Sequence, residues 1–114
     1  MFACIYQGYL KKGKEAAYKE AWKTVASYFM HCRGSLGSSL HVTEDGLWVA
    51  YSRWPCRKTR DASWPQGKDG ISNEIPLEIQ QAIHIIKDSI DESRKIPDIC
   101  MEVLEDLLSP ILNA

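Results

Sequence analysis

Side chains alternate between two faces in both halves of the segment 33–55, which predicts a hairpin of two half-buried strands. The loop between the halves is residues 44–46, whose glycine can take the left-handed conformation that a three-residue hairpin loop needs. If Thr43 pairs with Leu47, one face carries Leu36, Ser38, Leu40, Trp48, Ala50, Ser52 and Trp54. His41, Tyr51 and Arg53 then lie on the other face.

Two longer segments carry apolar residues at helical spacing. The first stripe is Tyr18, Trp22, Val25 and Phe29, and it predicts a helix that begins after Lys14 and ends near Gly34. The second stripe is Ile79, Ile83, Ile86 and Ile90, in a helix whose first turn suits Pro76. Both helices would pack their apolar stripes against the same face of a sheet.

The remaining segments complete the pattern. Residues 2–10 and 98–104 alternate as strands, residues 57–64 favour a short helix, residues 65–70 a polar loop, and residues 106–112 a tail. The main elements follow the order βαββαβ, which predicts an α+β, ferredoxin-like fold. In that fold two helices cover one face of a four-stranded antiparallel sheet, and the first strand lies between the hairpin and the last strand.

The sheet face away from the helices would carry apolar side chains, among them Ile5, Tyr9, Val49 and Tyr51. A bare patch of this kind is larger than monomeric proteins usually expose. We therefore expect a homodimer in which a second copy covers this face.

The composition of the chain predicts a single domain and argues against nucleic acid and membranes as partners. The chain has 114 residues, 45% of them hydrophobic, which suits a single domain spanning residues 1–114. Its formal net charge is −1, so no long-range field attracts nucleic acid. The first residues lack a signal-peptide pattern and no segment is long and apolar enough for a membrane span, so we expect no membrane partner and a cytoplasmic location.

The cysteines do not form a recognisable metal or disulfide pattern. Cys4, Cys32, Cys56 and Cys100 are widely spaced, with no histidine at metal-ligand spacing, and we expect free and mostly buried thiols. The sequence also has no phosphate-binding glycine-rich loop. We therefore expect no metal, flavin or heme cofactor.

Several short segments, taken in order, resemble the antibiotic biosynthesis monooxygenase family of dimeric α/β barrels. They are residues 6–13, the helix with Trp22, residues 34–38, Leu40-His41, Asp45-Gly46, residues 51–55 and residues 101–103. The resemblance covers most of the chain. It implies a family that includes enzymes oxidising fused-ring phenols and quinols with O2 without flavin or metal, heme-degrading enzymes, and proteins of undefined role.

The face of the sheet toward the helices offers a binding site for a flat ring. Ser38, Ser52 and Ala50 are small and leave space, and the aromatic side chains of Tyr6, Trp54 and Trp64 could hold a substrate. Ordinary core packing is the favoured interpretation of Trp54 and of a further tryptophan, Trp22, and it is the alternative for Trp64.

The opposite face offers polar chemistry. His41 could act as a base and Arg53 could stabilise an oxyanion, if the pocket reaches that face. We also expect Glu102 on this face. The favoured interpretation is a hydrogen-bonded network at a dimer interface, in which Arg53 pairs with Glu102 across or within subunits.

These observations favour a cofactor-independent monooxygenase that oxidises a small aromatic substrate, quinol or polyphenol-like, with O2. A non-catalytic homodimer that binds a small ligand or serves a structural role is the main alternative. Heme degradation fits less well, because Tyr6 stands where such enzymes carry an asparagine and no histidine occurs between Pro65 and Ile83.

Overall fold

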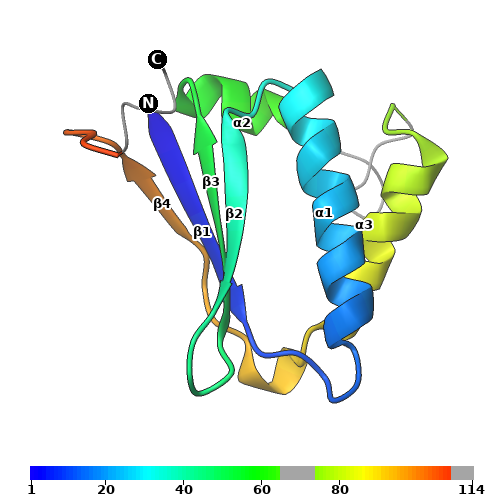
Figure 1. Cartoon of the computed structure of the whole chain (residues 1–114). Helices are drawn as coiled ribbons and strands as arrows, with labels where there is room; N and C mark the ends of the chain where they lie inside the picture. Colours follow the sequence, from blue (N-terminus) through cyan, green and yellow to red (C-terminus); the bar gives the residue numbers. More distant parts are fainter. Residues whose placement is uncertain (65–73, 109–114) are drawn as a thin grey trace.

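A computed structural model describes residues 1–64 and 74–108 of the chain. Four antiparallel strands form one sheet in the order β2-β3-β1-β4, and α1 and α3 lie side by side over one of its faces (Figure 1). The elements, in chain order, are β1 (Phe2–Gly8), α1 (Glu15–Cys32), β2 (Gly37–Val42), β3 (Trp48–Trp54), α2 (Arg57–Ser63), α3 (Leu77–Ser89), the 3-10 helix η1 (Glu92–Arg94) and β4 (Ile99–Glu102).

The predicted α+β, ferredoxin-like arrangement is confirmed. β1 lies between β3 and β4 and pairs antiparallel with both, as the order of elements predicts. The short helix predicted over 57–64 is α2. The predicted loop at 65–70 and the end of the predicted tail lie outside the described residues.

The hairpin has the predicted register but a later start. Leu40 pairs with Ala50, and the Thr43 amide donates to the Leu47 carbonyl at 2.8 Å. Leu36 was expected on the helix-covered face, yet it precedes β2 and is 51% exposed. Gly34 and Gly37 on either side have φ of +89° and +128°, so the chain is still turning out of α1 when it passes Leu36.

The first and last strands of the chain are shorter than predicted. β1 stops at Gly8, because the backbone beyond it bonds to the end of α3: the Lys11 amide donates to the Ser89 carbonyl and the Asp91 amide to the Tyr9 carbonyl, both at 2.8 Å. β4 covers Ile99–Glu102 rather than residues 98–104. The edge strand thus has only four residues.

The two helices bury five of the eight predicted stripe residues. Tyr18, Val25 and Phe29 of α1 are buried, and so are Ile79 and Ile83 of α3. Phe2, Cys4, Ala21, Trp54, Ile75 and Ala82 join Val25, Phe29, Ile79 and Ile83 in the buried cluster. Trp22, Ile86 and Ile90 are only partly buried, and Ile90 lies just beyond the end of α3.

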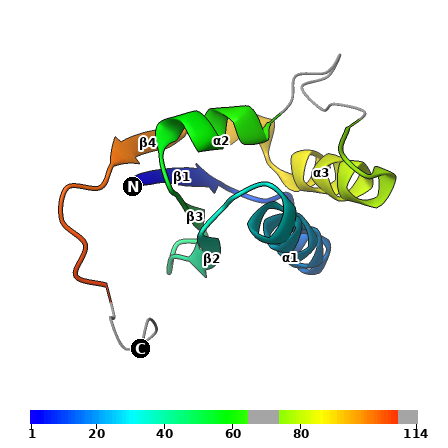
Figure 2. The ribbon, with the colours of Figure 1, turned by 90° about the horizontal axis from the view of Figure 1, so that it is seen from above.

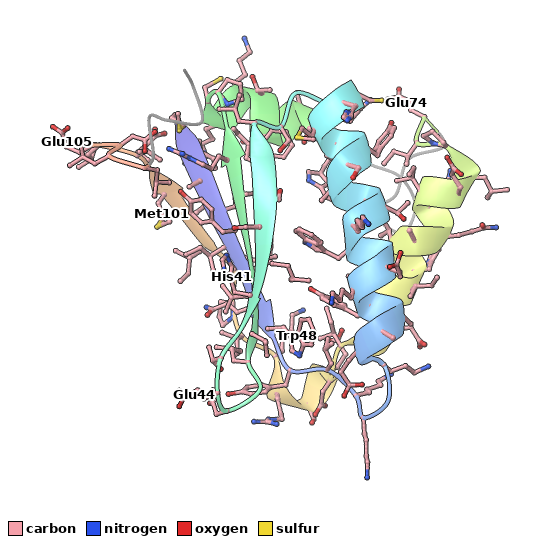
Figure 3. The ribbon with its side chains drawn as sticks, in the orientation of Figure 1. His41, Glu44, Trp48, Glu74, Met101 and Glu105 are labelled. Atoms are coloured by element: carbon pink, nitrogen blue, oxygen red, sulfur yellow. The ribbon has the colours of Figure 1, made fainter. Side chains whose placement is uncertain are left out.

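The other face of the sheet carries no helix, as Figure 2 shows. His41 and Met101 point to this side, whereas Trp48 points toward α1 and meets the ring of Tyr18 at 5.6 Å between centroids (Figure 3). The described tail, residues 103–108, leaves β4 on the uncovered side (Figure 2). Four apolar side chains of β4 and the tail are exposed: Ile99 at 43%, Leu104 at 90%, Leu107 at 91% and Leu108 at 60%.

Two predictions for this region are wrong. Glu102 pairs with Phe2, so it shares the helix-covered face of the sheet and does not join the polar group around Arg53. The partner of Arg53 is instead Asp106 of the tail, with 2.6 Å between Nη2 and Oδ2.

The cysteines are free, but they are not mostly buried. Cys4 is buried, whereas Cys32, Cys56 and Cys100 are exposed. The periodicity of α1 and β4 did not reveal this, because Cys32 ends its helix and Cys100 stands on a sheet edge. Within the described residues, no helix has the length and apolar character needed to cross a membrane.

Candidate active site

A cavity of about 300 Å³ lies between the sheet and the two long helices. Its floor is the helix-facing side of β1, β2 and β3, and its walls come from α1, α3 and Trp64, the residue after α2 (Arg57–Ser63). The lining includes all five predicted substrate-binding residues, Tyr6, Ser38, Ser52, Trp54 and Trp64. The alternation of the strands brings the first four of these residues to one face, and the segment after α2 adds Trp64.

Aromatic rings form one wall of the cavity. Trp64 stacks on Phe29 with 4.4 Å between ring centroids and 27° between planes. Trp54 meets the same phenyl ring edge-on at 6.4 Å and is only 3% exposed, so it serves the core as well as the cavity. A flat ring in the cavity would find both faces and edges of aromatic side chains within reach.

Trp22 also lines the cavity, which corrects the interpretation that it is a core residue. It shares the apolar stripe of α1 with Tyr18 and Phe29, but it is half-buried and stands outside the buried cluster. Tyr18 and Phe29 of this stripe meet sheet rings at Trp48 and Trp54, but the cavity also opens along the stripe, so Trp22 can remain accessible.

Hydroxyl groups and an indole N–H supply polarity in the middle of the cavity. The hydroxyl oxygens of Ser38 and Ser52 lie 2.9 Å apart, on neighbouring strands. Trp54 Nε1 is buried and has no hydrogen-bond partner among the described residues. An unpaired buried donor of this kind costs free energy unless a water molecule or ligand accepts from it.

At the polar end of the cavity, Tyr6 of the lining is bonded to an arginine that lies outside the lining. Arg60 Nη2 of α2 donates to Tyr6 Oη of β1 at 3.1 Å, and Arg60 Nη1 donates to Asp61 at 3.2 Å. Burial raises the pKa of Tyr6 to about 12, although the arginine opposes the shift. Tyr6 is therefore a neutral hydrogen-bonding group near pH 7, next to a fixed positive charge.

Asp98 provides the carboxylate of the cavity lining. It precedes β4 and is exposed as a residue, but partial burial of its carboxylate raises its pKa while the charges of Arg60 and Lys95 oppose the shift. A carboxylate with a raised pKa is a better proton acceptor than an ordinary aspartate. Sequence reasoning missed both Asp98 and Arg60, because neither stands in an apolar pattern and only the tertiary fold brings Asp98 to the cavity and Arg60 to Tyr6.

His41 and Arg53 lie on the sheet face away from the cavity (Figure 3 for His41) and are absent from its lining. His41 Nε2 bonds to Ser39 Oγ at 2.8 Å, and Arg53 pairs with Asp106. The condition attached to their predicted role, that the pocket reach this face, is not met in the described part of the chain. Within residues 1–64 and 74–108, no three His, Cys, Asp or Glu side chains gather as a group that could hold a metal ion.

Comparisons with known proteins bear on the fold. No protein-family model matches the chain, and no curated protein matches its sequence. Solved structures do match. A candidate antibiotic biosynthesis monooxygenase from Nitrosomonas europaea shows a TM-score of 0.66 and 20% identity, over 92% of this chain and all of that one.

Two further structures extend the comparison. SnoaB from Streptomyces nogalater, a cofactor-independent oxygenase, has a TM-score of 0.64 and 8% identity over 95% of this chain and 97% of its own. A conserved protein of unknown function from Bacteroides thetaiotaomicron has a TM-score of 0.63 and 10% identity over 90% and 96%. Because these identities are low, the similarity concerns the fold. The chain therefore has the fold of the antibiotic biosynthesis monooxygenases.

Proposed function

We propose that this protein is a cofactor-independent monooxygenase that oxidises a small, flat, quinol or polyphenol-like substrate with O2 in the cavity between the sheet and the helices. The observation that carries the proposal is the composition of the cavity. Its aromatic wall, built from Phe29, Trp54 and Trp64, leads to a polar end where Tyr6, held by Arg60, and Asp98 are found. Such a cavity suits a flat ring that carries an acidic oxygen or an acidic C–H.

The residues would divide the work as follows. The ring stacks beside Trp64 and Trp54, and Asp98 removes a proton from the substrate. The hydroxyl of Tyr6 and the charge of Arg60 stabilise the resulting anion. The electron-rich anion then donates an electron to O2.

The overall reaction balances without an added reductant when the substrate has an activated ring CH2 group. One atom of O2 becomes the carbonyl oxygen at that carbon, and the other leaves as water with the two hydrogens. All four electrons come from the substrate. Anthrone-like compounds, which form a stabilised anion at such a carbon, are accordingly the first substrates to test.

The assembly that accompanies this proposal is a homodimer in the cytoplasm. The uncovered sheet face, together with the exposed leucines of residues 104–108, supports a second copy as the cover. His41 and Arg53 would then belong to the interface rather than to catalysis.

Non-catalytic ligand binding is the second candidate, because the same cavity would serve it. Heme degradation remains less favoured, because Tyr6 stands where such enzymes carry an asparagine and no histidine occurs between Pro65 and Ile83. A purely structural role is disfavoured by a cavity of about 300 Å³, since a packed face would bury its side chains against each other.

Oxygen consumption by the purified protein across hydroquinones, anthrones and naphthols tests the proposal, with no metal or flavin added. We expect turnover of at least one substrate and a strong loss in Arg60→Met. Arg57→Met on the same helix is the matched control, because its side chain is 68% exposed and pairs with Asp61, whereas Arg60 also bonds the cavity residue Tyr6. Quenching of tryptophan fluorescence without any oxygen uptake would instead support the ligand-binding protein.

A further inference from the structure

Two cysteines that are far apart in the sequence face each other across the sheet. Cys4 of β1 and Cys100 of β4 are directly paired, and their Sγ atoms lie 3.8 Å apart. Both side chains point to the helix-covered side of the sheet. They are separated by 96 positions in the chain, so only the fold brings them together.

The pairing pattern of the two strands suits a covalent bond at this position. The Val103 amide donates to the Met1 carbonyl at 2.9 Å, which makes these two residues a hydrogen-bonded pair in the same register. Hydrogen-bonded and non-hydrogen-bonded pairs alternate along an antiparallel ladder, so Cys4 and Cys100 form a non-hydrogen-bonded pair. The α-carbons of such a pair lie about 4.5 Å apart, within the range of about 4.4–6.8 Å that disulfides span.

The two thiols differ in accessibility, which suits a reaction in which the exposed thiol meets the oxidant first and the buried thiol reacts second. Cys100 is exposed on the edge strand, where a small oxidant can reach it, whereas Cys4 is 0% exposed. Burial raises the pKa of Cys4, with Arg60 opposing the shift, so this thiol is protected at rest. The other exposed thiols, Cys32 and Cys56, stand outside the sheet, at the end of α1 and before α2.

We propose that Cys4 and Cys100 form a reversible cross-strand disulfide, which makes β4 a redox-sensitive edge of the sheet. The Cys100 thiolate attacks a low-molecular-weight disulfide such as oxidised glutathione and releases one reduced glutathione. Cys4 then gives up its proton and attacks the Cys100 sulfur, which releases the second. The two protein thiols lose two electrons and two protons, and the glutathione disulfide gains both.

The bond would act close to the cavity. Cys4 stands two residues before Tyr6 on β1, and Cys100 two residues after Asp98, and both of these neighbours line the cavity. Closing the sulfurs from 3.8 Å to the bond length of about 2.05 Å draws the four-residue β4 toward β1. The oxidised form therefore holds the polar end of the cavity more rigidly. This inference does not rest on the proposed activity, because its tests use mass and thermal stability.

The test equilibrates the full-length protein with reduced or oxidised glutathione, followed by alkylation, intact mass and peptide mapping. We expect the oxidised protein to lose two hydrogen atoms, to yield a Cys4–Cys100 linked peptide, and to retain alkylatable thiols at Cys32 and Cys56. Because the bond closes a loop of nearly the whole chain, Tm should rise by about 5 °C or more on oxidation.

Cys100→Ser should abolish both the linked peptide and the Tm shift, whereas the control variants Cys32→Ser and Cys56→Ser should keep them. Cys100 is exposed, so its variant is expected to fold even if Cys4→Ser, in the core, does not. A stable glutathione adduct on Cys100 with a free Cys4 would overturn the proposal. An unchanged mass after oxidation, or a Tm shift that persists in Cys100→Ser, would do the same.

Discussion

Trp64 and Trp22 line the cavity from different elements, and neither belongs to the buried cluster. Trp64→Ala removes a ring that stacks on Phe29, and we expect kcat/KM for an oxidised aromatic to fall about tenfold or more. The free energy of unfolding should fall by only about 1–2 kcal/mol, since a stacked aromatic pair contributes about 0.5–1.5 kcal/mol beyond area burial.

Trp22→Ala serves as the comparison. Replacing a core tryptophan with alanine lowers the free energy of unfolding by about 3–5 kcal/mol. Trp22 is half-buried at the cavity, so we expect a smaller loss for Trp22→Ala. Steady-state kinetics and urea unfolding of both variants give the answer. If turnover by Trp64→Ala were unchanged, the catalytic proposal would be wrong and non-catalytic ligand binding would be favoured.

Asp98 governs the pH dependence expected of the reaction. A base must be deprotonated to work, so kcat/KM should rise with pH through the pKa of Asp98, which burial places above the ordinary aspartate value. Asp98→Asn should lower kcat/KM about 100-fold or more and remove this acidic limb. Asp88→Asn, at an exposed ion pair with Lys11 and Lys14, should leave the profile unchanged. If the acidic limb of the pH profile were the same in Asp98→Asn, the base would be a residue other than Asp98.

Tyr6 should affect stability at alkaline pH. Its folded-state pKa of about 12 lies above the ordinary value near 10, so between these values the unfolded chain loses the phenolic proton while the folded chain keeps it. The contribution of Tyr6 is thus complete below about pH 10 and is lost as pH rises toward 12. Urea unfolding of the wild type should weaken more steeply over this window than unfolding of Tyr6→Phe. Parallel pH curves would contradict the raised pKa.

At the scale of elements, α1 is joined to the sheet through Phe29. This ring is 4% exposed and meets Tyr28, Trp54 and Trp64. Phe29→Ala should lower the free energy of unfolding by about 3–5 kcal/mol. Met30→Ala, one residue further on the same helix and 45% exposed, should change it by less than about 0.5 kcal/mol. Equal urea midpoints for the two variants would show that the helix does not depend on this contact.

At the scale of the whole molecule, the uncovered sheet face predicts a dimer. Size-exclusion chromatography with light scattering at micromolar concentration should give twice the mass of the chain. Met101→Lys places a charge on the uncovered face and should shift the protein toward monomer. Leu77→Lys, at a residue 68% exposed at the start of α3, should remain dimeric. If the wild-type protein were a monomer at this concentration, the predicted homodimer would be wrong.

Local periodicity in the sequence determined the order of elements, the helix stripes, the hairpin register and the face of each strand residue. These properties depend on neighbours a few positions apart, so Ser38, Ser52, Trp54 and Tyr6 could be assigned to one face before the fold was known. The pattern carried less information at the ends of elements, where Leu36 and Glu102 were misplaced.

Only the tertiary structure decided which sheet face holds the cavity and which polar groups reach it. Arg60 and Tyr6 are 54 positions apart, and Cys4 and Cys100 are 96 apart, so no local pattern links either pair. The helices cover one face of the sheet without filling all the space beneath them, which opens the cavity there and leaves His41 and Arg53 on the opposite side. Side-chain alternation defines two faces, but the packing of α1 and α3 determines which of them becomes a site.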